Sequence, residues 1–275
     1  MKSKIIRVYS ENATFQLIEV LRRNREKRQK QHEFLVEGVR PLNLARQNGW
    51  TINAWLYSPE RKLSDWATHL LAESPAPIHY EVAAPLFAKL SGKEEPSELL
   101  ALVAMPEDKL DRIPIKPTLL ILLFDRPASP GNLGTLIRSA DALGVDGLVI
   151  TGHAADLYDP ETISASIGTL FALPTIRIAS PRELEPWFAQ IRAQIGAFEI
   201  VGSSAKADRA ITEHDWKQPT ILVIGNETVG MSAHYRELCD VIVNIPIGGS
   251  ATSLNVACAA SIMLYEIQRQ RKAID

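Results

Sequence analysis

The feature that most constrains the fold is an alternation, from residue 119 onward, of short apolar runs with segments of helical periodicity. The first run, 119–124, is continuously apolar, as expected of a strand that is buried on both faces of a sheet. Further short runs follow at 147–150, 175–179, 199–201, 220–224 and 241–245. A long amphipathic helix is expected from about 254 to 271. Strands that alternate with helices predict a parallel α/β sheet.

The preceding part of the chain mixes shorter strands and helices. Strands are predicted at 34–36, 54–57, 78–82 and 99–103, and a helix over 40–48 that ends at Gly49. A polar, proline-bearing stretch at 105–117 indicates a linker. We therefore expect a basic N-terminal segment at 1–30, a smaller α/β domain at 31–104, a linker at 105–117 and the parallel-sheet domain at 118–275.

The composition is that of a globular protein with substantial cores, because 46% of the 275 residues are hydrophobic and 23% are charged. The cysteines, Cys239 and Cys258, cannot form a disulfide framework, and no metal-ligand spacing surrounds them. Buried, reduced thiols and no bound metal are expected. The chain has no apolar run of membrane-spanning length and no signal-peptide core, so a cytoplasmic protein is expected.

Positive charge is concentrated at residues 22–30, which read RRNREKRQK. Since the net charge of the chain is −2, any contact with nucleic acid must come from a local patch. The run fits either a solvated helix face or a phosphate-binding patch. The candidate phosphate ligands are Arg22, Arg23, Arg25, Lys27 and Arg28.

Polar loops follow three of the predicted strands, and ligands of open α/β sheets bind beyond the carboxyl ends of strands. The first loop, 125–134, contains Asn132 where a helix N-cap is expected, and Arg138 lies on the helix that follows. The second loop, 224–232, reads IGNETVGMS. Its glycines allow the backbone to approach a ligand, Glu227 offers a carboxylate, and its final serine can cap the next helix.

The third loop, 245–257, reads IPIGGSATSLNVA. Ser253 is expected to open the last helix, and with Asn255 it flanks Leu254, so that hydrogen-bonding groups border an apolar wall. This arrangement suits an uncharged, purine-bearing ligand better than a phosphate. Each loop taken alone is also explained by ordinary caps and turns. Neither G-x-G-x-x-G nor a P-loop occurs, which disfavours nicotinamide and nucleoside-triphosphate enzymes.

Taken together, the three loops resemble the signature motifs of the SpoU/TrmH branch of the SPOUT RNA methyltransferases. The first is similar to N-x-G-x-x-x-R (Asn132, Gly134, Arg138), the second to G-N-E-x-x-G-[LM]-S, and the third to I-P-[MI]-x-G-x-x-x-S-L-N-V. The likeness extends over roughly 119–266. More loosely, 34–40 and 86–90 resemble the ribosomal-protein-like substrate-binding domain of family members, which adds Arg40 to the candidate RNA contacts.

This resemblance implies an α/β domain with a deep trefoil knot, a homodimer formed through that domain, and S-adenosylmethionine bound in the knot. It implies methyl transfer to a ribose 2′-hydroxyl of RNA, with Arg138 activating the hydroxyl. Because free arginine titrates above about 12, Arg138 is easier to accept as a phosphate anchor that stabilises the developing alkoxide than as a base. The implied cofactor pocket contains Ser203, Gly225, Gly230, Ile245 and Leu254. The implied catalytic set is Asn132, Arg138, Glu227, Ser253 and Asn255.

One position departs from the family pattern. Residues 164–168 read SASIG where the family usually has R-A-S-x-G, so a cation near the RNA is missing at Ser164. Other interpretations are a non-catalytic RNA-binding relative, a SPOUT enzyme that modifies a base, and a tRNA 2′-O-methyltransferase. A substrate-binding domain of this type is more frequent among enzymes that act on rRNA, so rRNA is the expected substrate.

Overall fold

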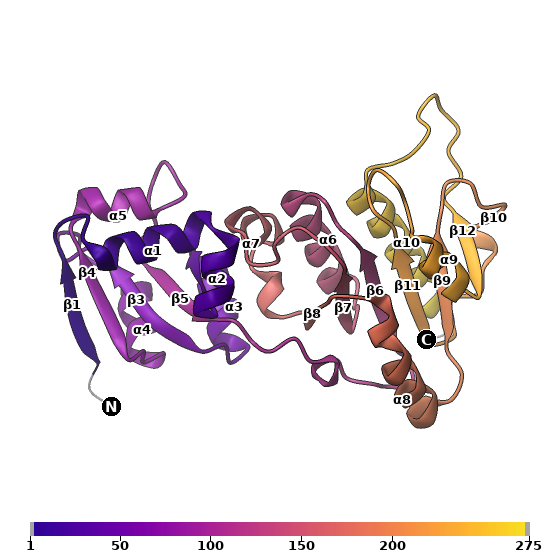
Figure 1. Cartoon of the computed structure of the whole chain (residues 1–275), viewed down its shortest axis with the longest axis horizontal. Helices are drawn as coiled ribbons and strands as arrows, with labels where there is room; N and C mark the ends of the chain where they lie inside the picture. The colour runs from indigo at the N-terminus through magenta and orange to yellow at the C-terminus, as the bar shows by residue number, and fades with distance from the viewer. Residues whose placement is uncertain (1–2, 273–275) are drawn as a thin grey trace. The chain divides into compact units, whose positions relative to one another are not determined.

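The computed structural model describes residues 3–272 and divides into two compact units (Figure 1). Unit 1 contains the residues up to 107 together with 156–172, and unit 2 contains 108–155 and the residues from 173 onward. The chain therefore leaves unit 2 after the first two strands of its sheet, contributes residues 156–172 to unit 1, and then returns. None of the described helices is long and apolar enough to cross a membrane.

Unit 1 is built on a five-stranded sheet with the order β1-β4-β3-β5-β2. The strands are β1 (Lys4–Val8), β2 (Glu33–Glu37), β3 (Ile52–Tyr57), β4 (Ile78–Val82) and β5 (Leu100–Ala104). The four predicted strands are confirmed, and β1 is an addition. β1 runs parallel to β4 from the Lys4–Ile78 pair to the Val8–Val82 pair. The residues before 31, which we expected to be a separate basic segment, are therefore part of this sheet domain.

Helices cover both faces of the unit 1 sheet. They are α1 (Ala13–Arg23), α2 (Arg25–Gln31), α3 (Val39–Gln47), α4 (Asp65–Glu73) and α5 (Ala84–Leu90). The Asn12 side chain caps α1 by accepting a hydrogen bond from Phe15 N at 3.0 Å. The apolar stripe of α1 packs with α5 against one sheet face, to which β3 contributes Leu56. Burial of that stripe is the main reason that the sequence after Asn12 is helical.

The opposite face of this sheet contacts the segment 156–172, which forms α7 (Pro160–Ser166) and η2 (Thr169–Phe171). Phe34 on β2 lies with its ring centroid 4.5 Å from that of Tyr158 and 6.1 Å from that of Phe171. The indole of Trp50 meets Phe171 edge-on at 5.0 Å and donates a hydrogen bond to its carbonyl at 2.9 Å. This aromatic cluster explains why the segment packs with unit 1.

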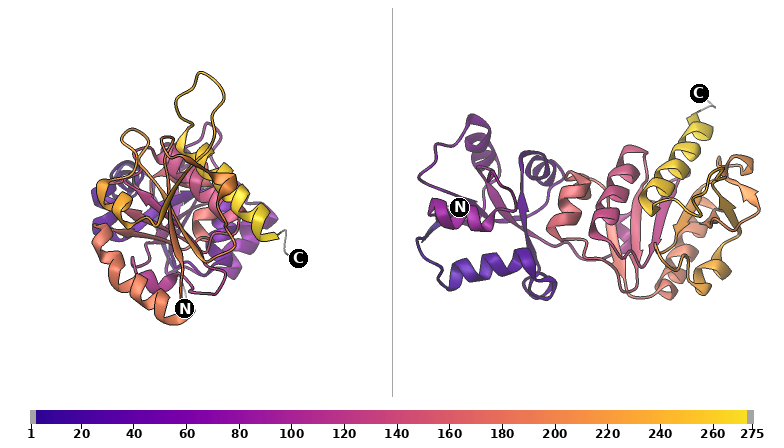
Figure 2. Two further views of the ribbon diagram at one scale, coloured as in Figure 1. Left: turned by 90° about the vertical axis from the view of Figure 1, so that its right-hand side faces the viewer. Right: turned by 90° about the horizontal axis from the view of Figure 1, so that it is seen from above.

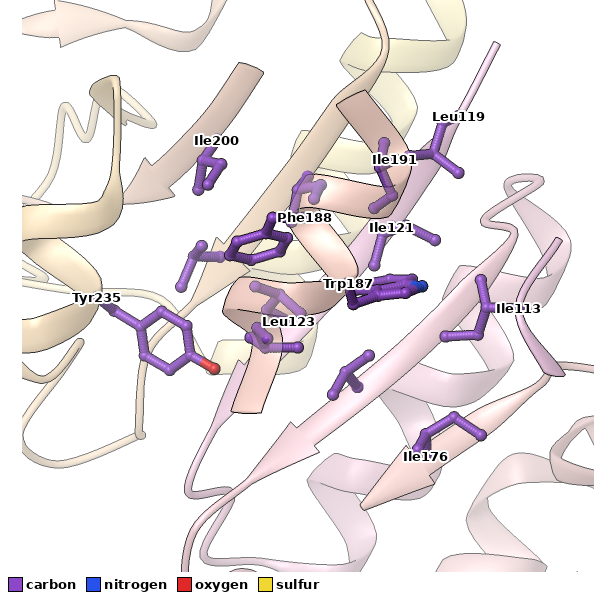
Figure 3. Packing of buried hydrophobic residues seen from close by; sticks show 14 of the residues in the cluster. Ile113, Leu119, Ile121, Leu123, Ile176, Trp187, Phe188, Ile191, Ile200 and Tyr235 are labelled. Carbon is purple, nitrogen blue, oxygen red and sulfur yellow. The ribbon is translucent and has the colours of Figure 1, made fainter. Parts of the chain in front are cut away.

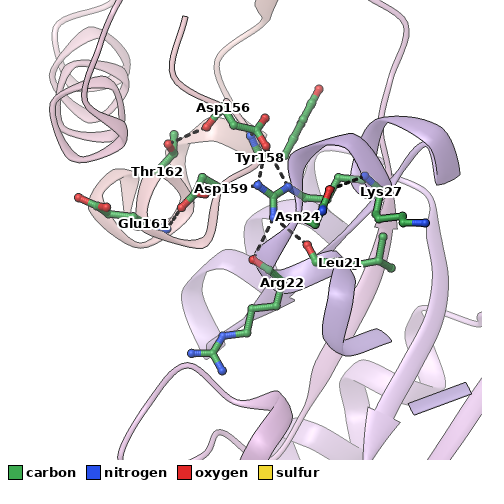
Figure 4. A network of polar contacts seen from close by, with 10 residues as sticks. Leu21, Arg22, Asn24, Lys27, Asp156, Tyr158, Asp159, Glu161 and Thr162 are labelled. Atoms are coloured by element: carbon green, nitrogen blue, oxygen red, sulfur yellow. Dashed lines mark hydrogen bonds and ion pairs between the residues drawn. The ribbon is translucent and has the colours of Figure 1, made fainter. Parts of the chain in front are cut away.

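A buried ion pair adds to the attachment of this segment (Figure 4). Arg28 on α2 is only 2% exposed, and its guanidinium donates to Asp156 at 2.6 and 2.9 Å and to Asp159 at 3.3 Å. The same guanidinium also donates to the carbonyls of Leu21 and Arg22. Arg28 is therefore fully used inside the unit, and our prediction that it contacts RNA phosphate is wrong.

Unit 2 is built on a seven-stranded sheet with the order β10-β12-β9-β11-β6-β7-β8, in which every pairing is parallel. The strands are β6 (Leu120–Asp125), β7 (Gly147–Thr151), β8 (Thr175–Ile178), β9 (Glu199–Ser203), β10 (Arg209–Ala210), β11 (Thr220–Ile224) and β12 (Val241–Asn244). The predicted parallel α/β fold is confirmed. Because all strands point the same way, the loops that follow them meet at one edge of the sheet.

The helical elements of unit 2 are η1 (Leu110–Arg112), α6 (Pro130–Ala142), η3 (Pro181–Leu184), α8 (Glu185–Ile195), η4 (Ile211–Glu213), α9 (Ala233–Leu238) and α10 (Val256–Lys272). Trp187, Phe188 and Ile191 of α8 pack on one sheet face with apolar residues of β6 and β7 (Figure 3). α10 packs along α6 (Figure 2), where Ser261 Oγ lies 2.7 Å from Ser139 Oγ. The chain therefore returns from the distal strand β12 to α6, the helix that follows β6.

Removing the Arg28 side chain should destabilise unit 1 strongly. Arg28→Ala leaves the Asp156 carboxylate buried without its partner, which costs about 3–5 kcal/mol of unfolding free energy. Urea unfolding, with hydrogen exchange to localise the loss to unit 1, measures the effect. The control is Arg23→Ala, which removes an exposed arginine that pairs with Glu19 and should cost about 0–1 kcal/mol. Equal losses in the two variants would contradict the prediction.

Candidate active site

A cavity of about 450 Å³ lies in unit 2 at the carboxyl ends of β9, β11 and β12. It is bordered by the loop that follows each of these strands, including the second and third loops recognised in the sequence. The five residues that the resemblance placed in a cofactor pocket, Ser203, Gly225, Gly230, Ile245 and Leu254, all line it. Residues as far as 51 positions apart in the sequence (Ser203 and Leu254) thus meet around one space because neighbouring strands end together.

The second loop is held by hydrogen bonds within itself. Gly230 N donates to the Asn226 carbonyl at 3.0 Å, and Asn226 N donates in return at 3.2 Å. Gly230 has φ +70°, a conformation that favours glycine. A Cβ added at Gly225 would lie only 2.2 Å from Met231 N. Glycine at 225 is therefore required by the close approach of the loop's own backbone.

Asn226 carries a structural role that sequence reasoning missed. Its side-chain oxygen accepts hydrogen bonds from the backbone of Thr228 at 2.8 Å and Val229 at 3.1 Å, and its amide donates to the Arg126 carbonyl at 2.7 Å. The side chain thus forms the turn and joins it to the loop after β6. An asparagine at the start of a predicted loop is the sequence signal for such a turn, because its side chain can accept a hydrogen bond from the backbone N–H two residues further on.

Glu227 joins the first two loops. Its carboxylate accepts a hydrogen bond from Ala128 N at 2.9 Å and from Ser129 N at 3.3 Å, and a third from the Asn132 side-chain amide at 3.2 Å. The three donors belong to the segment that leads into α6. Since the Glu227 oxygens are occupied by these donors, the side chain positions the loop.

Asn132 and Asn255 connect the first loop to the third. Asn255 donates a hydrogen bond from its amide to Asn132 Oδ1 at 3.0 Å, and its own Oδ1 accepts from the backbone of Ala257 at 2.9 Å and Cys258 at 3.3 Å. Glu227, Asn132 and Asn255 therefore form one continuous hydrogen-bonded chain. The structure brings together side chains that are more than 90 residues apart in the sequence.

Two helix starts differ from our predictions. Ser129 is the N-cap of α6, since its hydroxyl accepts from Asn132 N, and Asn132 itself lies inside the first turn. α10 begins at Val256 with the side chain of Asn255 at its start, so Ser253 lies before the helix. In both cases a nearby Ser or Asn takes the N-cap position. The sequence pattern cannot tell which of two such residues will be the cap, because both types are favoured there. The predicted cap of α9, Ser232, is confirmed.

The two remaining members of the predicted catalytic set have solvent-exposed side chains. Arg138 is exposed on α6, and Ser253 is exposed and lines the cavity. Within residues 3–272, neither makes a hydrogen bond or ion pair through its side chain. The guanidinium charge of Arg138 is therefore available to a ligand from outside the chain.

The remaining candidate phosphate ligands of unit 1 differ in availability. Arg22 donates to the carbonyls of Lys89 and Ser91, and Arg23 pairs with Glu19. Arg25 is half-buried. Lys27 and Arg40 are exposed, and the described part of the chain offers their charges no partner.

The S-A-S-I-G segment, in which the family cation is missing, lies on α7 and the turn that follows. Ser164 is exposed, whereas Ser166 is buried and its hydroxyl donates to the Ile163 carbonyl at 2.9 Å. Gly168 has φ +84°, and a Cβ there would lie 2.6 Å from Pro41 Cα. The serine and the glycine of this motif therefore shape the contact with α3.

Both cysteines are free, and neither is fully buried as expected, since Cys239 is half-buried and Cys258 is exposed. Burial raises the pKa of the Cys239 thiol to about 12, so it stays protonated at neutral pH. Cys258 is exposed on α10, and the prediction that it is buried is wrong. Between residues 3 and 272, no group of three or more His, Cys, Asp or Glu side chains is arranged to hold a metal ion.

Comparison with known proteins finds two family matches. The SpoU rRNA Methylase family matches residues 119–265, and the SpoU L30e-like domain matches residues 12–101. A 23S rRNA (uridine(2479)-2′-O)-methyltransferase from Streptomyces viridochromogenes is 48% identical over 96% of this chain and 92% of its own. A 23S rRNA (guanosine(2553)-2′-O)-methyltransferase, RlmP from Bacillus subtilis, is 29% identical over 89% and 92%.

Solved structures agree with these matches. The SpoU methyltransferase AviRb from Streptomyces viridochromogenes, in complex with the cofactor AdoMet, superposes with a TM-score of 0.89 at 48% identity and covers 95% of this chain and 99% of that chain. An AdoMet-bound rRNA methyltransferase from Sinorhizobium meliloti superposes with a TM-score of 0.84 at 26% identity, over 96% and 98% of the two chains.

Gly225→Ala should distort the second loop and lower the stability of unit 2. The new Cβ would meet backbone atoms at 2.2 and 2.4 Å, which a side-chain rotation cannot relieve. We expect a loss of about 1–3 kcal/mol, typical of overpacking, measured by thermal unfolding, and faster hydrogen exchange at 225–232. The matched control is Gly248→Ala, because no atom lies within 4 Å of a Cβ there. If both variants unfold at the same temperature as the parent, the backbone around Gly225 can accommodate a Cβ and glycine is not required there.

Proposed function

The chain belongs to the SpoU rRNA methylase family, and from this premise we propose how the cavity and the polar chain beside it modify ribosomal RNA. It is an RNA 2′-O-methyltransferase that takes its methyl group from S-adenosylmethionine and acts on rRNA. We assign 23S rRNA as its substrate because two relatives that match most of its length are named for 23S rRNA. Because that substrate belongs to ribosomes, we propose the cytoplasm as the place of action.

The cavity suits S-adenosylmethionine in size and chemistry. Its volume lies within the range of about 300–1,000 Å³ that is usual for small-molecule sites. Ile245 and Leu254 give it apolar walls for a purine, and Gly225 exposes backbone that can hydrogen-bond the ring. The cofactor supplies an activated methyl group on a sulfonium. The family implies that this pocket lies in a deep trefoil knot.

The observation that carries the catalytic proposal is the hydrogen-bonded chain of Glu227, Asn132 and Asn255. A displacement requires the ribose oxygen to be aligned with the methyl carbon, and such positioning can supply about 7–11 kcal/mol. These hydrogen bonds hold the loop before α6 against the loops that border the cofactor cavity. Glu227 and Asn132 are positioning residues in this proposal, whereas the exposed hydroxyl of Ser253 is placed to contact substrate or cofactor.

Arg138 is the residue that we assign to the reacting hydroxyl. Its guanidinium is exposed and, among the described residues, unpaired. Arginine is a permanently charged residue type in proteins, so we assign it an electrostatic role. It holds the adjacent phosphate and stabilises the alkoxide that develops as the hydroxyl proton leaves to a phosphate oxygen.

Unit 1 binds the RNA away from the reacting ribose in this proposal. Lys27 and Arg40 are its best candidates for phosphate contacts, since both are exposed and free within the described range. The match of residues 12–101 to the SpoU L30e-like domain supports the assignment. Arg28 has no part in it.

We also propose a homodimer formed through unit 2. Cys258, Ile262 and Tyr265 lie at positions i, i+4 and i+7 of α10 and are all exposed, Ile262 by 42% and Tyr265 by 62%. Val229 and Leu254, on the second and third loops, are exposed as well. An exposed apolar stripe on a helix next to apolar loops is typical of an interface between subunits.

Arg138→Ala should slow methyl transfer strongly and leave cofactor binding intact. Removing a group that stabilises transition-state charge lowers kcat by about 10²–10³-fold. The assay is transfer of labelled methyl from S-adenosylmethionine to rRNA from a strain that lacks the protein, with calorimetry for cofactor affinity. Arg192→Ala, another helix arginine of unit 2, is the control. Equal loss of turnover and cofactor binding would argue against this role.

Ile262→Lys should convert the dimer to a monomer. A lysine in the middle of an apolar interface would have to be buried without a partner, which favours dissociation. Sedimentation velocity measures the change. Leu17→Lys is the matched control, since Leu17 is an equally exposed apolar residue (40%) on unit 1. A parent protein that sediments as a monomer would refute the dimer.

A further inference from the structure

A second cavity, of about 440 Å³, opens in unit 2 at the carboxyl ends of β6, β7 and β8. It lies along the same sheet edge as the cofactor cavity but on the other half of the sheet. Its lining comes from four separate segments of the chain. The side chains that matter for its chemistry are Arg126, Thr151, Ser180, Arg182, Ser232 and His234.

Arg126 is held in a fixed position at this cavity. Its backbone has φ +52°, which is uncommon for a residue other than glycine and marks local strain. Its guanidinium forms a two-point ion pair with Asp125, Nε to Oδ1 at 2.9 Å and Nη2 to Oδ2 at 3.0 Å. Its aliphatic stem occupies the space above Gly152, where a Cβ would lie 2.8 Å from Arg126 Cγ. The guanidinium is therefore oriented before any ligand arrives.

The acidic groups near the cavity are already engaged. Asp125 is 2% exposed, and its Oδ2 also accepts a hydrogen bond from Ser232 N at 2.8 Å. Glu183, which follows Arg182, turns its carboxylate back to Ser180 N at 2.9 Å. Both oxygens of Asp125 therefore have partners within the protein, and Glu183 directs one of its oxygens into its own turn.

Two cavity residues have nitrogen atoms without partners. Arg182 is exposed, and in the described part of the chain its side chain makes no ion pair or hydrogen bond. His234 is half-buried, and its Nε2 is fully buried with no hydrogen-bond partner within residues 3–272. A buried polar atom without a partner is uncommon and requires an explanation. An anionic ligand in the cavity would supply acceptors to both residues.

We propose that this cavity binds a backbone phosphate of the substrate RNA, close to the nucleotide that is methylated. Guanidinium groups are suited to phosphate because their planar N–H groups match two oxygens at once. The loop after β6 connects the two sites, since Asp125 and Arg126 border this cavity and Ala128 and Ser129 donate to Glu227. A phosphate here would hold the RNA strand along the sheet edge. The inference rests on the proposed action on rRNA.

Arg182→Ala tests the proposal without disturbing the catalytic loops. With rRNA as substrate, KM should rise about five- to tenfold, and the slope of log affinity against log salt should fall by about 0.7–0.9, as expected for one lost phosphate contact. Turnover at saturating RNA and cofactor affinity should stay at the parent values, and Arg182→Lys should restore part of the RNA affinity. The control is Lys217→Ala, which removes one exposed charge before β11, at the opposite edge of the sheet.

The outcomes separate the inference from the proposed function. If the parent protein methylates rRNA and Arg182→Ala has the same KM and salt slope as Lys217→Ala, the phosphate site is refuted and the methyltransferase assignment stands. If the parent transfers no methyl group to rRNA, the proposed function has failed. Inorganic phosphate at constant ionic strength provides a further arm. Stabilisation of the parent but not of Arg182→Ala, with unchanged KM for RNA, would show a free-anion site and overturn the RNA assignment.

Discussion

The hydrogen bonds to the Glu227 carboxylate are the interaction on which the candidate active site depends. Parallel strands bring three loops to one sheet edge, but strand ends alone do not set the conformation of a loop. Glu227 accepts two backbone amides and the Asn132 side chain from the loop before α6, and Asn132 passes the connection on to Asn255. Hydrogen bonds with an ionised acceptor are stronger than neutral ones, so a single carboxylate can order the entire site.

The arginines of this chain are used in contrasting ways. Arg28 is buried between two aspartates and holds residues 156–172 in unit 1, where it stabilises the fold only. Arg126 is fixed by one aspartate at a cavity mouth and keeps part of its guanidinium for a ligand. Arg138 is exposed and has no side-chain partner among the described residues, which is why we propose it for the reaction. The number of carboxylates that pair with the guanidinium therefore differs among these three arginines, and residue type alone does not predict it.

The catalytic domain was largely predictable because its strands are buried on both faces and read as continuous apolar runs, as in residues 119–124. The loop motifs were predictable as a set, since the three loops that contain Asn132, Glu227 and Asn255 each follow a strand and together resemble the signature motifs of one family. Two helix starts were predicted at the wrong residue, because Ser129 and Asn255 offer side chains as suitable for capping as those of the predicted residues. The role of Asn226 was missed because a side chain that bonds its own loop leaves no periodic pattern.

The amino-acid sequence by itself determined the parallel α/β class, the family and the cofactor, because these follow from local hydrophobic patterning and contiguous motifs. The tertiary structure decided what depends on partners that are distant in the chain. Arg28 belongs to a charge-rich run that resembles a phosphate-binding patch, and only its burial against Asp156, 128 positions away, removes it from the RNA contacts. The tertiary structure likewise decided that residues 156–172 belong to unit 1 and that the second cavity forms. Both depend on burial and on charge pairing between residues that are distant in the sequence, and no local window of sequence contains these contacts.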